Sequence, residues 1–80
     1  MSTKDTSSVD MKISAYIKRH QVERGVTQAM MAKAANRNQS YISAHLRGDW
    51  SWSVNDIAAI APLFGFTSIA SFLSEALSEH

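Results

Sequence analysis

Cysteine is absent from this chain of 80 residues, which also has only one proline and three glycines. Without cysteine the chain can form neither a disulfide nor a thiolate metal site, and it suits a reducing compartment. Long apolar runs are missing as well, since no stretch approaches the roughly 20 residues of a membrane span. These absences argue against a disulfide-stabilised secreted domain and against a membrane partner.

The length is that of one small domain, and 45% hydrophobic residues supply a helical core with little room for a deep catalytic cleft. Residues 1–9 are polar and lack the apolar segment of a signal peptide, so we expect a flexible tail before a single domain at 10–80. We find no Ser–His–acid arrangement, no glycine-rich phosphate loop and no paired carboxylates at a spacing that catalysis could use. His20 and His45 have no cysteine or acidic cluster beside them. The sequence therefore predicts no enzyme, no cofactor and no metal site.

Basic residues are missing from the C-terminal part of the chain. Residues 11–48 contain seven lysines and arginines and one acidic residue, Glu23, whereas residues 49–80 contain four acidic residues and no lysine or arginine. Such segregation predicts a positive face that attracts polyanions. An unevenly charged but merely solvated surface is the alternative.

Capping residues and glycines divide the chain into five short helices, and no segment has the pattern of a strand. Pro62 lies in the last turn of the fourth helix and predicts a kink or an early end there. The expected fold class is all-α, a compact five-helix bundle. The expected helices are 10–24 with Asp10 as N-cap, 28–35 between Thr27 and Asn36, 39–47 between Asn38 and Gly48, 54–64 between Ser53 and Gly65, and a fifth that starts at Thr67 or Ser68.

The second and third helices, joined by a short turn, form a helix-turn-helix pattern, in which the second helix can enter the major groove of DNA. The stretch NRNQSYISAHLRG, residues 36–48, places Ile42 and Leu46 on one side of the third helix and amides and hydroxyls on the other. Amide and hydroxyl groups match the donors and acceptors on base edges. Gln28 lies beside free backbone N–H groups that suit a phosphate. The sequence therefore predicts a recognition helix at about 38–47 and these DNA-binding residues: Gln28, Arg37, Asn38, Gln39, Ser40, Tyr41, Ser43, Ala44 and Arg47, of which Arg37, Tyr41 and Arg47 flank the helix and reach the DNA backbone.

The stretch RGVTQAMMAKAANRNQSYISAHLRG resembles the Cro/repressor (XRE-type) helix-turn-helix family of phage and bacterial regulators. The shared features are a Gly-x-Thr-Gln start, an alanine in the first helix, a turn, and a serine-containing helix with a closing glycine. With the order of the helices, the resemblance covers residues 13–66. It implies a lambda-repressor-like fold and a small Cro-like or immunity repressor that binds double-stranded operator DNA in the cytoplasm of a bacterial host. It further implies base contacts by Asn38, Gln39, Ser40 and Ala44 and phosphate contacts by Gln28 and Arg47.

Two features depart from the family pattern. An arginine near the end of helix one and a glutamate near the end of the recognition helix are replaced by Gln21 and Leu46, so the ion pair common in the family is absent. The glycine often found in the turn is Asn36, which tolerates a left-handed conformation.

The oligomeric state and the binding partner of the chain have several interpretations from sequence alone. Family members bind DNA as dimers, and we expect a weak or DNA-induced homodimer that uses the fifth helix or the loop around Trp50. Of Trp50 and Trp52, one should close the core and the other should be partly exposed. An antitoxin-like protein that binds a toxin and its own operator is one alternative, and a helical protein-interaction adaptor is another. The apolar stripe of the fifth helix consists of Ile69, Phe72, Leu73, Ala76 and Leu77.

Overall fold

The computed structural model describes residues 8–78, and the regular elements of this part of the chain are all helices, without a strand. The all-α fold class is therefore confirmed, and residues 1–7 of the expected tail lie outside the described residues. The elements are α1 Ser8–Gln21, α2 Gln28–Ala35, α3 Gln39–Leu46, α4 Val54–Ile60, the 3-10 helix η1 Ala61–Phe64 and α5 Ile69–Ser78.

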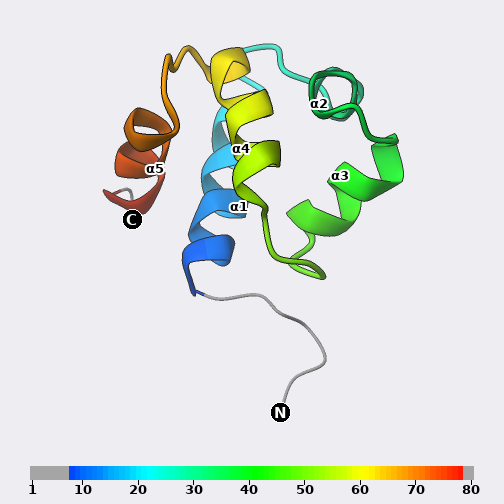
Figure 1. The fold of residues 1–80 in the computed structure, drawn as a ribbon, viewed down its shortest axis with the longest axis horizontal. Coiled ribbons are helices and arrows are strands. Elements are labelled where there is room, and N and C mark those ends of the chain that lie inside the picture. Colours follow the sequence, from blue (N-terminus) through cyan, green and yellow to red (C-terminus); the bar gives the residue numbers. More distant parts are fainter. Residues whose placement is uncertain (1–7, 79–80) are drawn as a thin grey trace.

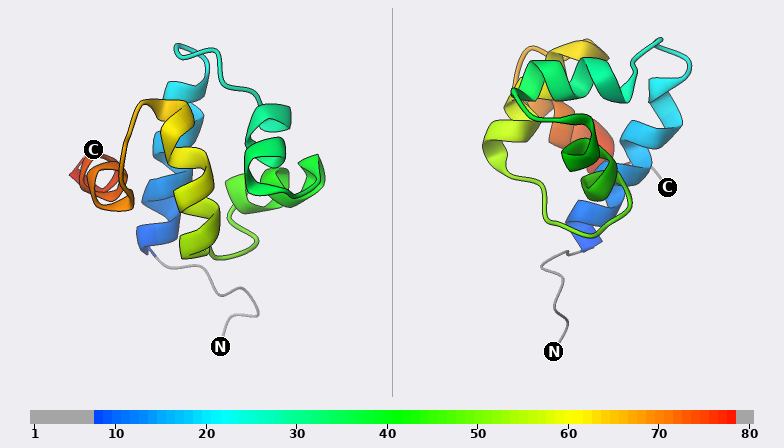
Figure 2. Two further views of the ribbon diagram at one scale, coloured as in Figure 1. Left: turned by 45° about the horizontal axis from the view of Figure 1, so that its top comes forward. Right: turned by 90° about the vertical axis from the view of Figure 1, so that its right-hand side faces the viewer.

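The helices are arranged with α1 and α4 in the middle, α5 on one side and the α2–α3 pair on the other (Figures 1 and 2). Helix α1 packs against α5 and α3, while α4 packs against α2 and α5. The two helices of the predicted helix-turn-helix also pack on each other, so that α3 lies at the edge of the molecule.

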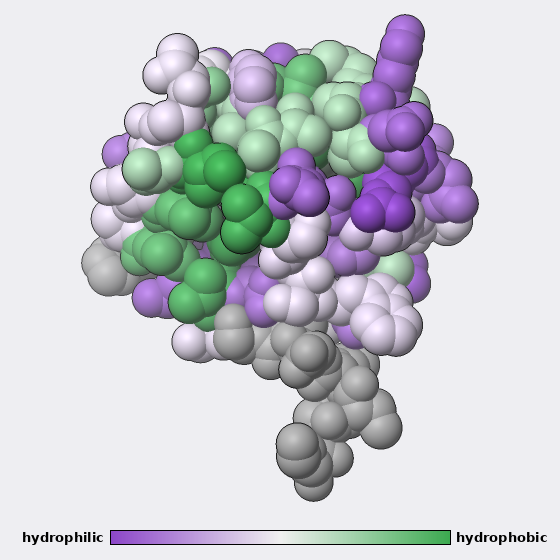
Figure 3. Space-filling view, in the orientation of Figure 1, coloured by the Kyte–Doolittle hydropathy of each residue, from purple (hydrophilic) through white to green (hydrophobic). Residues whose placement is uncertain are grey.

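A single core joins all the helices. It is built from the apolar stripes that face inward at helical spacing, so each short helix is stabilised mainly by the burial of one side. Its largest fully buried side chains are Ile13, Ile17, Met31, Ile42, Ile60, Phe64 and Phe72. On the outside, hydrophobic residues gather over α5 and the adjoining side of α4, whereas hydrophilic residues gather on the side of α2 and α3 (Figure 3).

Side-chain caps begin the middle helices where the sequence predicts them. Thr27, Asn38 and Ser53 each accept a hydrogen bond from the backbone N–H three residues later, at 3.1, 2.9 and 3.1 Å. Asn36 ends α2 in the left-handed conformation with φ 57°. Because these caps satisfy backbone groups that a helix cannot pair internally, they fix the start of α2, α3 and α4 and the turn before α3.

The bounds of α1 differ from those expected. The helix begins at Ser8, and Asp10 lies inside its first turn, where its carboxylate accepts hydrogen bonds from Trp52 N and Ser51 Oγ, both at 2.8 Å. Asp10 is thus not the N-cap, because its side chain is held by the segment before α4. The helix ends at Gln21, whose carbonyl accepts from Val26 N at 2.8 Å, so residues 22–25 form a turn.

Pro62 ends α4 early, as expected. The chain continues from Ile60 as η1, with the proline at the start of that 3-10 segment, and Gly65 closes it with φ 85°. A proline is tolerated there because the first N–H groups of a helical segment have no internal partner. No single helix of residues 8–78 is long and apolar enough to cross a membrane; only α4 with η1, taken together with α5, reaches the required length and composition, and that pair is bent by 81°.

Candidate nucleic-acid interface

Helix α3 has an inward side and an outward side. Ile42, His45 and Leu46 are buried, which fixes the helix on α1 and α2. On the opposite side Gln39, Ser40 and Arg47 are exposed, whereas Ser43 and Ala44 are partly covered. We call this outward side the recognition face; it consists of Gln39, Ser40, Ser43, Ala44 and Arg47.

The first turn of α3 presents uncharged hydrogen-bonding groups. Asn38 Oδ1 accepts from Tyr41 N and from Ser40 Oγ, both at 2.9 Å, so this oxygen is used by the cap. Gln39 is exposed at the first position of the helix, and its side chain makes no hydrogen bond to another described residue. Of the predicted base-contacting residues, Gln39 therefore has the amide best placed to pair with an outside partner, and Asn38 can offer its NH₂ group.

A small hollow joins the end of α3 to the start of α2. Its volume is about 270 Å³, and it brings together Gln28 and Arg47, the two residues for which the family resemblance implies phosphate contacts. Lys18 of α1 lines the same hollow and was not predicted from the sequence. Gln21 and Leu46, which replace the ion pair common in the family, also line it and so lie close together. The Oε1 atom of Gln21 is buried without a hydrogen-bond partner.

The predicted positive face is partly neutralised by two acidic residues. Arg47 donates from Nε and Nη2 to Asp49 Oδ2, at 3.1 and 3.0 Å, and from Nη1 to Ser43 Oγ at 3.0 Å. Arg37 Nε lies 3.8 Å from Oδ1 of Asp56. Both acids belong to the acidic C-terminal part of the sequence, which the fold brings back onto the arginines that flank α3. The charge segregation along the chain is therefore weaker on the folded surface.

Tyr41, which the sequence predicts to reach the DNA backbone, has its hydroxyl engaged within the protein. The hydroxyl points toward α4 and donates a hydrogen bond to Asp56 Oδ2. The ring lies beneath the Arg37 guanidinium, 4.5 Å from centroid to Cζ, and stacks on His45 at 4.2 Å. Tyr41 is thus a support that joins α3 to α4, and it holds Arg37 beside the recognition helix.

Asp56 also explains why the capping box of α4 has only half of its usual bonds. Ser53 Oγ accepts from Asp56 N, but the Asp56 carboxylate accepts from Tyr41 rather than reaching back to Ser53 N. The aspartate that stands in place of the more usual glutamate thus bonds Tyr41 on α3 instead of completing the capping box.

The Tyr41–Asp56 bond predicts a stability change at alkaline pH. Burial, then the hydrogen bond to Asp56 and its negative charge, raise the pKa of the Tyr41 phenol above 10.0, while Arg37 acts in the opposite direction. A raised folded-state pKa contributes stability that is complete below the unfolded value and is lost as the pH rises through the folded value. Urea unfolding should therefore show falling stability above about pH 10.

The matched variant is Tyr41→Phe, which removes the titrating group and keeps the ring. It should be less stable by about 1 kcal/mol at neutral pH, since one hydrogen bond is lost. It should then lose less stability than the wild-type protein across the alkaline range. Equal alkaline losses in the two proteins would contradict the proposed role of Tyr41.

A buried series of hydrogen bonds holds the C-terminal end of α3. Trp52 Nε1 donates to Ser14 Oγ at 2.9 Å, and Ser14 Oγ donates to the carbonyl oxygen of His45 at 3.0 Å. His45 Nδ1 bonds the carbonyl oxygen of Tyr41 at 2.7 Å, and its ring packs on Trp52 at 5.0 Å. The expectation for the tryptophans is confirmed, because Trp52 is 7% exposed and closes the core whereas Trp50 is 57% exposed.

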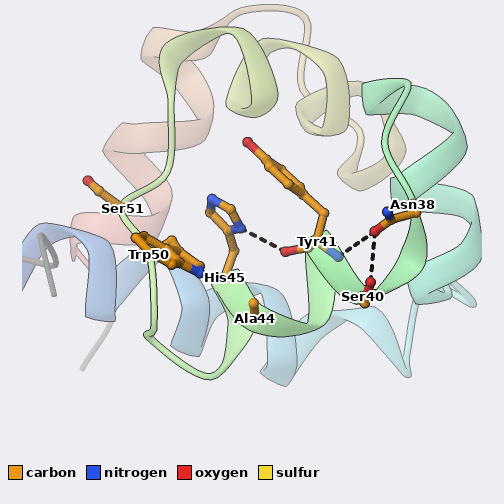
Figure 4. A pocket seen from close by; sticks show the side chains of 7 residues that line it. All are labelled: Asn38, Ser40, Tyr41, Ala44, His45, Trp50 and Ser51. Carbon is orange, nitrogen blue, oxygen red and sulfur yellow. Dashed lines mark hydrogen bonds between the residues drawn. The ribbon is translucent and has the colours of Figure 1, made fainter.

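A groove runs along α3 beside the segment that leads to α4 (Figure 4). Trp50 and Ser51 form one end of it and Asn38 and Ser40 the other. The fold thus adds Trp50 to the surroundings of the recognition helix, although the sequence left the role of this residue unassigned. Sequence reasoning also missed Lys18 and Asp56, because nothing in the local pattern marks them as neighbours of α3. It missed the pairing of Asp49 with Arg47 as well, although the two are only 2 positions apart.

Comparisons with known proteins provide no relative from which a function could be transferred. No protein-family model, curated protein or solved structure matches this chain. Within residues 8–78, no group of three or more histidine, cysteine, aspartate or glutamate side chains could hold a metal ion. The function must therefore be inferred from the surface around α3.

Proposed function

We propose that this protein is a sequence-specific double-stranded DNA-binding regulator of transcription, of the Cro/repressor (XRE) type with a lambda-repressor-like fold. The observation that carries the proposal is the pairing of two short helices whose outer helix, α3, has an exposed face of amides, hydroxyls and one arginine. A helix of this kind fits the major groove, where base edges offer hydrogen-bond donors and acceptors.

In this proposal the N-terminal end of α3 contacts bases and its C-terminal end contacts the DNA backbone. Gln39 and Ser40, in the first turn, face base edges, with Ser43 and Ala44 one turn further along. The hollow that contains Gln28, Arg47 and Lys18 lies against the DNA backbone, because an amide and two cations suit phosphate oxygens. Phosphate contacts set the position of the helix and base contacts provide the specificity.

Two copies are proposed to bind together, weakly or only on DNA, since one small domain covers about one half-site. Helix α5 offers a surface for this contact. Phe72 and Ala76 are buried, but Ile69, Leu73 and Leu77 are only partly covered. The hydrophobic area of Figure 3 lies over this helix. Part of the apolar stripe of α5 is therefore available to a second copy.

The proposal predicts duplex binding that weakens steeply with salt. Each phosphate that a cation neutralises contributes about −0.9 to the slope of log affinity against log salt concentration. We expect a slope smaller in size than the seven cationic residues of positions 11–48 would give, because Asp49 and Asp56 pair with two of the arginines. Fluorescence anisotropy with a labelled duplex over a salt series measures it, and affinity that does not change with salt would rule out the proposed backbone contacts.

Selection of bound duplexes from a random DNA library tests specificity and assembly together. A motif with two-fold symmetry is expected if two copies bind inverted half-sites. The absence of any enriched motif would overturn the proposed function. In that case a protein partner, as in an antitoxin or an adaptor, would be the better hypothesis.

A further inference from the structure

The groove beside α3 is large enough to receive part of another molecule. Its volume of about 650 Å³ lies within the range of small-molecule sites in proteins, although it is open along the surface. It lies between α3 and the segment 48–53, and its two ends come from different parts of the chain (Figure 4). The lining consists of Asn38, Ser40, Tyr41, Ala44, His45, Trp50 and Ser51.

The lining of the groove is mostly apolar. The packed rings of Tyr41 and His45 contribute to it, together with the Ala44 methyl group and the Trp50 indole. Its polar groups are one amide, two serine hydroxyls and the polar atoms of the three rings, and no acidic, lysine or arginine side chain lines it. A phosphate would therefore gain little inside the groove, whereas an apolar and uncharged part of a ligand would be accommodated.

Trp50 is exposed but its backbone is held on both sides. Before it, Asp49 N donates to the carbonyl oxygen of Ala44 on α3 at 3.0 Å. After it, Ser51 Oγ and Trp52 N both donate to Asp10 on α1. A large exposed ring on a fixed segment loses little conformational freedom on binding, which is the property that makes tryptophan a strong contact residue at interfaces.

The groove is continuous with the recognition face, because Ser40 and Ala44 belong to both. We propose that the groove receives the deoxyribose edge of one DNA strand, with Trp50 packed against the sugar, so that Trp50 is a further DNA-contacting residue. This inference rests on the proposed function. The sugar is the part of the strand that fits, since it is uncharged and lies between the bases that face α3 and the phosphates that face the arginines.

The test uses the full-length protein and a duplex selected by it from random DNA. Trp50→Ala should weaken binding about tenfold, the loss typical of truncating an interface tryptophan. The salt dependence should be unchanged, because no charge is removed. Trp50→Phe should keep most of the affinity. Met11→Ala is the matched control, since Met11 is also an exposed apolar residue but lies on α1 outside the groove.

A second readout follows Trp50 directly. Trp52 is buried, so acrylamide should quench mainly the fluorescence of Trp50, and bound duplex should protect it. Duplexes with an abasic deoxyribose at single positions then separate sugar from base. At the position that the ring covers, Trp50→Ala should still weaken binding about tenfold when the duplex is abasic. If the variant and the wild-type protein bind that abasic duplex equally well, Trp50 packs on the base, and the assignment to the sugar is wrong.

Other outcomes separate this inference from the proposed function. If the wild-type protein binds a selected motif but Trp50→Ala binds as tightly as Met11→Ala, or if Trp50 stays equally open to acrylamide in the complex, the role of Trp50 is wrong and the proposed function stands. If the wild-type protein selects no duplex, both are wrong. Circular dichroism should show an intact fold in every variant, because the substituted side chains are exposed.

Discussion

Trp52→Ala is expected to lower the free energy of unfolding by about 3–5 kcal/mol, the usual loss when a large aromatic side chain is removed from a core. The ring is 7% exposed and packs on His45. Its removal leaves a cavity and takes the Nε1 donor from Ser14 Oγ. Because small domains are stable by only about 5–15 kcal/mol, this loss is a large part of the total.

Urea unfolding followed by far-ultraviolet circular dichroism measures the effect without depending on tryptophan fluorescence. Trp50→Ala is the matched control, because it deletes the same side chain at an exposed position and should change stability by no more than about 0.5 kcal/mol. Trp52→Phe should be intermediate, since it keeps a ring but loses the hydrogen bond to Ser14. A loss below about 1 kcal/mol for Trp52→Ala would mean that the buried series of hydrogen bonds does not hold α3 as described.

The helices could be predicted from the sequence because their signals are local. A cap lies three residues from the N–H that it satisfies, and an apolar stripe repeats within each helix, so Thr27, Asn38 and Ser53 could be recognised without knowledge of the fold. Helical spacing also separated the buried Ile42 from the exposed Gln39. The same reasoning failed at Asp10, where the helix-capping pattern was present but a distant partner decided the role of the side chain.

The bonds of Asp56 and Asp10 could not be predicted, because the fold brings their partners together from distant parts of the sequence. Asp56 bonds Tyr41 across 15 positions of the sequence, and Asp10 bonds Ser51 across 41. A count of charges along the chain assigns Asp56 to a separate acidic half. In the structure it lies beside Arg37 and bonds Tyr41, which changes the electrostatics of the proposed interface.

The groove could not be predicted for a related reason. One of its walls is α3, which the sequence identified, but the other is the irregular segment 48–53, whose path depends on hydrogen bonds to Asp10 in α1. Most of the residues on α3 could therefore be predicted from the sequence, whereas the residues that surround α3 could not.

Gln39→Ala and Arg47→Ala should separate recognition of bases from binding of the backbone. Gln39→Ala is expected to weaken binding to the preferred duplex by about 1–3 kcal/mol and to relax the preference at one base pair of each half-site. Binding to unrelated duplexes and the dependence on salt should barely change, because no charge is lost. The measurements are affinities for the selected motif, for its single-base variants and for unrelated duplexes, each over a salt series.

Arg47→Ala should instead weaken binding to all duplexes alike and flatten the salt slope by about one unit. The pair with Asp49 makes the expected loss larger than that of one contact, because the variant leaves an uncompensated carboxylate beside the approaching phosphate. The double variant Arg47→Ala/Asp49→Asn is the matched control and should recover part of the affinity. Asp49→Asn alone should tighten binding to every duplex, since the phosphate no longer competes with Asp49 for the guanidinium.

Both single variants should fold, because Gln39 and Arg47 are exposed, and circular dichroism must confirm this before affinities are compared. The contrast between the two variants, rather than either loss alone, is the decisive result. Equal weakening of all duplexes by Gln39→Ala, with the fold intact, would mean that the first turn of α3 does not contact bases. A sequence-dependent loss from Arg47→Ala would mean that the end of α3, rather than its beginning, enters the major groove.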